Sequence, residues 1–140
     1  MRLALAAALC ALLAANAAHA QQTPEQMKAE AQAKLDAFPY KNTPEASVFR
    51  GQIVFLNYCM LCHGPNADGQ GRSARLYNPK PANLRASMMN DQYKEMIVRR
   101  GGKGMGRSEF MPPWNEELTD EQVGDVVNYL RSIAPADAPK

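Results

Sequence analysis

The feature that most restricts this chain is a cluster of reactive side chains in "NYCMLCHG", residues 57–64. Cys59 and Cys62 are separated by two residues, and His63 follows directly. Two thiols at this spacing can bind zinc, exchange disulfides, or form thioether bonds with the vinyl groups of a haem. Each of these chemistries requires a different fold around the motif, so the rest of the sequence decides among them.

The first 20 residues predict export from the cytoplasm. Arg2 precedes an apolar run at 3–15, and residues 18–20 have the small-x-small pattern of a signal peptidase site. The run holds 13 residues, fewer than the ~20 that a transmembrane helix needs. We therefore expect 1–20 to be a signal peptide that is cleaved before Gln21, a mature chain in the periplasm, and no membrane insertion of that chain.

Cleavage would leave Cys59, Cys62 and His63 as the only cysteines and histidine of the mature chain. A structural zinc site usually takes two separate ligand pairs, and a second pair is missing here. A thioredoxin-like redox pair needs a βαβ frame, yet no segment shows a convincing alternating strand pattern. A lone disulfide would leave His63 without a role. Covalent attachment of a haem, with His63 as the proximal iron ligand, accounts for all three side chains.

Three stretches around the motif predict helices. Each begins at a polar N-cap side chain and carries apolar residues at three- and four-residue steps. They run from Pro44 into the cysteine motif, from Asp91 to Arg100 before a pair of glycines, and from Thr119 to the proline at 135. Gly51 lies inside the first helix, where glycine costs about 1 kcal/mol relative to alanine. This position predicts a close approach of another backbone.

Residues 21–43 precede these helices and are rich in glutamine, alanine, lysine and glutamate. Thr23, Pro24 and Gln26 are typical of a capped helix start. We expect an N-terminal extension made of a short helix and a proline-containing linker. Whether this helix packs on the domain, docks a partner or frays stays open.

From about Thr43 onward the chain resembles class I (mitochondrial-like) c-type cytochromes of the bacterial periplasmic monohaem type. The resemblance is carried by Gly51, Phe55, the cysteine motif through Gly64, "MPPW" at 111–114, and "LTDEQVGDVVNYLRS" at 118–132. It implies an all-α, small cytochrome c fold of about four to five helices around one covalently bound haem c. The cytochrome c domain would cover 44–140, with Gly51 and Phe55 facing Val126 and Tyr129 where the first and last helices cross.

Methionine is the natural sixth iron ligand, because the mature chain has no second histidine. Met111 precedes Pro112 and Pro113, which hold a loop extended, and the resemblance assigns the ligand to the same position. Met105, Met88 and Met89 are rivals. By resemblance, a proline carbonyl accepts the other ring N–H of His63. Pro81 is the expected residue, with Pro79 as the alternative.

Histidine and methionine ligands together predict a non-enzymatic, one-electron carrier in the periplasm. Its partners would be a redox protein donor and acceptor, such as a periplasmic dehydrogenase or a membrane complex. The alternative is a haem c subunit of a multi-subunit oxidoreductase, or a ligand-binding haem whose methionine is displaceable. The net charge of the mature chain is +1, since 15 basic residues remain against 14 acidic ones. This balance predicts no nucleic-acid binding, and we expect a monomer.

Two further features of the sequence, a group of cations and a tryptophan, each allow two interpretations. Arg99, Arg100, Lys103 and Arg107 surround the approach to Met111 and form either a solvated cluster or a rim that steers an acidic redox partner. Trp114 either donates its indole N–H to a haem carboxylate or fills the core.

Overall fold

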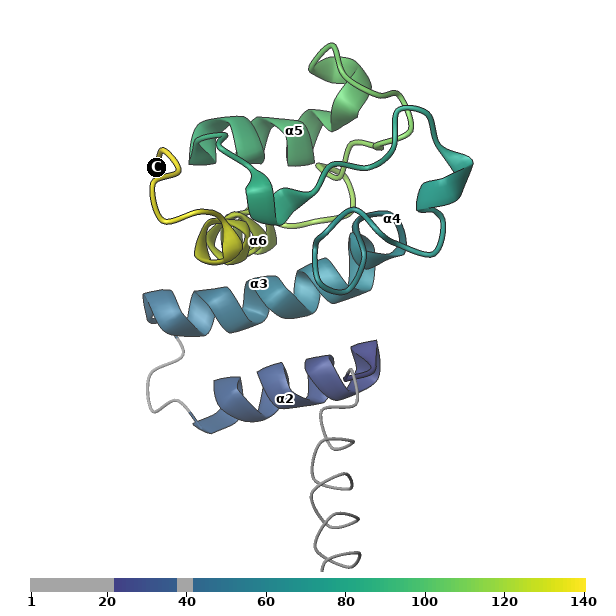
Figure 1. Cartoon of the computed structure of the whole chain (residues 1–140). Coiled ribbons are helices and arrows are strands. Elements are labelled where there is room, and N and C mark those ends of the chain that lie inside the picture. The colour runs from purple at the N-terminus through teal and green to yellow at the C-terminus, as the bar shows by residue number, and fades with distance from the viewer. Residues whose placement is uncertain (1–21, 38–41) are drawn as a thin grey trace, which may run out of the picture.

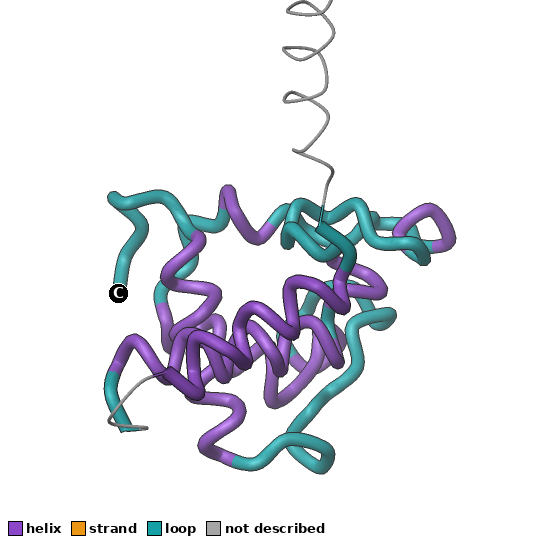
Figure 2. The backbone as a smooth tube through the Cα atoms, turned by 90° about the horizontal axis from the view of Figure 1, so that it is seen from below, coloured by secondary structure: helices purple, strands orange, loops and turns teal. Residues whose placement is uncertain are grey.

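The computed structural model describes residues 22–37 and 42–140, so the expected signal peptide lies outside it. Throughout these residues the backbone forms helices and loops without a strand (Figure 2). The α-helices are α2 (Pro24–Ala37), α3 (Pro44–Tyr58), α4 (Met60–His63), α5 (Asp91–Gly104) and α6 (Asp120–Ile133), and two short 3-10 helices are η1 (Ala74–Leu76) and η2 (Leu84–Ala86). The prediction of an all-α fold with four to five helices is confirmed.

The predicted helix starts are confirmed by their capping hydrogen bonds. The backbone N–H of Ala46 donates to the Thr43 hydroxyl over 3.1 Å at the start of α3. Asn90 caps α5 in the same way. Thr119 and Gln122 form a reciprocal capping box at the start of α6. Each cap satisfies backbone donors that the first helical turn cannot satisfy itself.

Helices α3 and α6 cross steeply, since α3 lies across the view of Figure 1 while α6 is seen nearly end-on. Gly51 allows the crossing: a Cβ there would overlap the backbone carbonyl of Asp125 and lie 2.9 Å from Tyr129 Cβ. The rings of Phe55 and Tyr129 pack with centroids 5.3 Å apart. The expected contact with Tyr129 is confirmed, although the residue against Gly51 is Asp125 rather than Val126.

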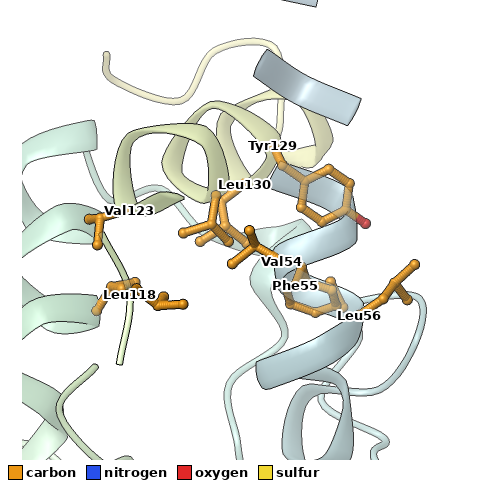
Figure 3. Close-up of a cluster of buried hydrophobic side chains, with 10 residues drawn as sticks. Val54, Phe55, Leu56, Leu118, Val123, Tyr129 and Leu130 are labelled. Atoms are coloured by element: carbon orange, nitrogen blue, oxygen red, sulfur yellow. The ribbon is translucent and has the colours of Figure 1, made fainter. Parts of the chain in front are cut away.

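The hydrophobic core lies at this crossing. Figure 3 shows Val54 and Phe55 of α3 against Tyr129 and Leu130 of α6. The largest fully buried side chains are Phe55, Leu56, Val123 and Val126. Each contributes about 1.5–3 kcal/mol by leaving water, so this contact is the main apolar support of the fold.

A buried carboxylate joins the same two helices. Asp125 is 4% exposed. It accepts hydrogen bonds from the Ser47 hydroxyl over 2.6 Å and from Arg50 Nε over 2.7 Å. Asn128 in turn donates to Ser47 over 2.7 Å. A buried charge is tolerated only when its oxygens are satisfied in this way, so the network fixes the register of α3 on α6.

The N-terminal extension forms helix α2, and its packing could not be predicted from the sequence. Its beginning at Pro24 confirms the predicted capped start, and it lies along α3 on the side away from α5 (Figure 1). Ala31 is 1% exposed, and Met27 packs against the core. The extension therefore packs on the helical domain. Among the described helices, none combines the length and apolarity needed to cross a membrane.

Candidate functional site

The cysteine motif forms one tight turn at the end of α3. The Cys59 N–H donates to the Phe55 carbonyl over 2.8 Å, which continues α3 into the motif. Helix α4 then carries Cys62 and His63, and Gly64 ends it with a φ of 79°. This turn places both thiols and the imidazole beside one cavity. In the described part of the chain, neither thiol is part of a disulfide.

The ring of His63 is held by a backbone carbonyl. Its Nδ1 lies 3.0 Å from the oxygen of Ala82. A carbonyl can only accept, so Nδ1–H donates and the lone pair of Nε2 is left for a metal. Burial lowers the pKa of His63, while the Ala82 hydrogen bond opposes that shift. Both the tautomer and the neutral charge suit an axial iron ligand.

The predicted acceptor for His63, the Pro81 carbonyl with Pro79 as alternative, was wrong by one residue. The Pro81 oxygen lies instead against Gly69, where an added Cβ would stand only 2.7 Å from it. Successive carbonyls of an extended segment point in different directions. Because the Pro81 carbonyl faces Gly69, the next carbonyl, that of Ala82, is the one that points toward the His63 imidazole.

The cavity beside the motif fits a haem in size and in lining. Its volume is about 860 Å³, toward the upper end of the ~300–1,000 Å³ typical of sites that enclose a whole organic ligand. Its walls come from α3, α5, α6 and the loops between them, and Cys59, Cys62, His63 and Met111 all line it. Burial, and secondarily the nearby Cys62, raise the pKa of Cys59 to about 12. This apolar setting suits an uncharged thioether.

Met111 lies on a loop that two glycines hold against α5. Gly101 leaves the helical conformation with a φ of 68°. The Gly102 N–H donates to the Met111 carbonyl over 2.9 Å, and the Gly102 carbonyl accepts from the Arg107 N–H over 2.7 Å. A Cβ on Gly102 would overlap the backbone carbonyl of Ser108. The loop can approach this closely only because residue 102 has no side chain.

The rival methionines differ in their positions. Met88 and Met89 also line the cavity, but they are 45% and 42% exposed. Met105 caps the end of α5 and does not line the cavity. Met111 is half-buried, lines the cavity, and has its carbonyl bound to the Gly102 N–H of α5. Its assignment as an iron ligand stays a prediction.

From the sequence, Gly101 and Gly102 predict only the end of a helix. It was not predicted that both glycines also allow the Met111 loop to approach α5 closely. The signal was the pair itself, since one glycine suffices to end a helix. The role of Gly71 was not predicted either, and a Cβ there would overlap the backbone of Leu61 and Cys62. Through Gly71 the loop after the motif folds back onto the motif.

The four cations around the approach to Met111, which the sequence left as either a solvated cluster or a rim, have different surroundings. Arg99 forms ion pairs with Glu95 over 2.8 Å and with Asp120 over 2.7 Å, so its charge is balanced on the surface of α5 and α6. Of the four cations, Arg107 alone lines the cavity. Trp114 lines the cavity and also packs against the core, with its ring edge-on to Tyr58.

Comparison with known proteins identifies the family of this chain. One similar protein is a nicotinate dehydrogenase subunit of Pseudomonas putida, which is 26% identical over 121 residues. The match covers 83% of this chain and 9% of that protein, so the chain spans less than a tenth of the relative's length. The family model described as cytochrome c matches residues 48–134, from the second turn of α3 to the end of α6. This is more than half of the chain, and the protein belongs to the cytochrome c family.

Proposed function

We propose that this protein is a periplasmic electron carrier with one haem c of the class I type. Cys59 and Cys62 would form the thioethers, and His63 and Met111 the axial ligands. The observation that carries the proposal is that all four side chains line one apolar cavity. Within it, His63 and Met111 are each held by a backbone hydrogen bond, to Ala82 and Gly102 respectively.

The mechanism follows from what these residues hold in place. When bound, the haem would supply a reversible one-electron Fe(III)/Fe(II) couple. The Ala82 carbonyl fixes the plane and tautomer of the His63 ring, so Nε2 would be held in one position toward the iron. Gly102 and the two prolines after Met111 restrict its loop in the same way. Rigid ligands reduce the rearrangement that each electron transfer requires.

The walls of the cavity serve the same chemistry by excluding water. Phe55, Val98, Val126 and Leu130 line it and are at most 7% exposed. A dry, apolar surrounding favours the less charged state of a metal centre, and a thioether ligand favours Fe(II) further. The site is therefore suited to electron transfer, and both axial positions would be filled by the protein's own side chains.

The rim of the cavity would be the place where redox partners dock. Tyr58, Met88, Met89 and Phe110 line the cavity and are 37–47% exposed. The segment 69–90 beside them carries four lysines and arginines and no carboxylate. An apolar centre next to unbalanced positive charge fits a partner with an acidic surface.

A second candidate function is favoured by the Pseudomonas putida relative, a dehydrogenase subunit that is more than ten times longer than the match. The chain would then be the haem c subunit of an oxidoreductase complex. Purification of the chain from its native source separates the two functions. A shuttle elutes alone at the size of the mature chain, whereas a subunit elutes with a dehydrogenase chain in fixed ratio.

The ligand assignment is tested with two matched methionine variants. In the haem-loaded protein, Met111→Ala should abolish the weak charge-transfer band at the red edge of the ferric spectrum and lower the reduction potential, because the thioether favours Fe(II). Met105→Ala should leave both unchanged, since Met105 does not line the cavity. The reverse pattern would refute the role of Met111. A wild-type protein that is high-spin and binds carbon monoxide would favour a ligand-binding haem instead.

A further inference from the structure

The charge of the cavity lining is one-sided. The lining includes Lys80, Lys94 and Arg107 but neither aspartate nor glutamate. The ring of a haem is apolar and gives no reason for positive walls, but each haem also carries two propionate carboxylates. Carboxylates that leave water need cationic or hydrogen-bonding partners. The cations of the lining are therefore candidates for the site that holds these two groups.

Arg107 is already oriented for such a role by a neighbouring hydroxyl. Its Nε donates to the Tyr93 hydroxyl oxygen over 3.2 Å. Both residues line the cavity, and Tyr93 belongs to the first turn of α5. Within the described residues, the guanidinium has no carboxylate partner. Its terminal nitrogens can thus bind an anion, and the Tyr93 O–H can donate to the same anion.

Lys94 is next to Tyr93 and is a buried cation whose charge is only partly balanced. It is 5% exposed, and a lysine this buried normally has a close partner. Its Nζ lies 3.4 Å from Asp91 Oδ1, which is a long contact. The other oxygen of Asp91 accepts from Arg131 over 2.7 Å. One carboxylate is therefore shared by two cations, and a second anion would complete the charge balance around Lys94.

We propose that Tyr93, Lys94 and Arg107 form the site that holds the two haem carboxylates, at the end of the cavity built by the first turn of α5 and the loop before Met111. The proposal rests on the proposed function, because it requires a haem in this cavity. Arg107 would then bind a haem carboxylate, keep it ionised and add positive charge beside the haem, and Tyr93 would be the positioning residue that orients Arg107. Lys80 lies on the loop between η1 and η2, is exposed, and is not needed for this site.

The test compares two arginine variants of the haem-loaded protein by spectroelectrochemical titration over the acid and neutral pH range. Arg107→Gln should lower the midpoint potential, because a cation near the iron is lost. It should also make the potential depend on pH, because a carboxylate without its cation takes up a proton more easily. Arg100→Gln is the control, since Arg100 is exposed and does not line the cavity. Its potential and pH profile should match those of the parent.

A third variant separates a site from a general charge effect. Tyr93→Phe keeps the net charge but removes the hydroxyl that orients Arg107, and it should introduce a pH dependence in the same direction as Arg107→Gln. Equal shifts in Arg107→Gln and Arg100→Gln, or no change in the pH profile of Arg107→Gln, would overturn the proposal. These outcomes are distinct from failure of the proposed function, which would show as missing haem or an altered iron spectrum in the parent protein.

Discussion

The crossing of α3 and α6 can be tested by adding one carbon atom to Gly51. In a helix, alanine is about 1 kcal/mol better than glycine. At residue 51, however, the new Cβ would overlap the Asp125 carbonyl and approach Tyr129 Cβ to 2.9 Å. A backbone carbonyl cannot rotate away as a side chain can, so we expect a cost in the upper part of the ~1–3 kcal/mol range for overpacking. The gain of about 1 kcal/mol in helix propensity offsets part of this cost. Gly51→Ala should therefore lower the free energy of unfolding by about 1–2 kcal/mol in total.

The assay is urea unfolding of the haem-loaded protein followed by circular dichroism, and Gly124→Ala is the control. Gly124 also lies within a helix, but a Cβ there would meet no atom within 4 Å. Its stability should stay constant or rise by as much as ~1 kcal/mol. In thermal unfolding, each kcal/mol corresponds to about 4–8 °C for a domain of this size. If Gly51→Ala is as stable as Gly124→Ala, the close approach of the two helices is not what requires glycine.

Two further changes probe the network and the methionine loop. Asp125→Asn should lower the free energy of unfolding by about 2–3 kcal/mol in urea, because Arg50 loses its closest charged partner and the amide has one acceptor oxygen where the carboxylate has two. Either the Ser47 hydroxyl or Arg50 Nε would then face an N–H donor. Asp120→Asn removes an ion pair with Arg99 at a carboxylate that is 91% exposed, and should cost less than about 1 kcal/mol; similar losses would refute the special role of the buried pair. Gly102→Ala should displace the Met111 loop and weaken the charge-transfer band of the ferric protein, while an unchanged band would show that the loop does not depend on this glycine.

The helices and their boundaries were largely predictable because their signals are local. Thr43, Asn90 and Thr119 each cap the helix that the sequence assigned to them. The crossing at Gly51 was predictable for another reason. A glycine inside a helix carries a cost that a close contact explains, and the family resemblance indicated the partner helix.

The remaining features depend on distances in space that no local pattern encodes. The acceptor for His63 is Ala82 and not Pro81 because the extended segment turns the Pro81 carbonyl toward Gly69. The position of the Met111 loop depends on backbone contacts of Gly102 with Ser108 and Met111, which lie several residues further along the chain. The packing of α2 on α3 uses a thin apolar stripe that includes Met27 and Ala31. In the sequence, such a stripe is too weak a signal to separate docking from fraying.

The central claim is that Cys59 and Cys62 hold one haem covalently in the cavity beside them. Intact mass spectrometry under denaturing conditions tests it directly, on protein expressed with a haem-attachment system. We predict a mature chain heavier by the mass of one haem, and a Cys59→Ala, Cys62→Ala double variant that yields only the bare chain. A wild-type protein with the mass of the bare chain, or a haem that extracts freely into acidified organic solvent, would contradict the account.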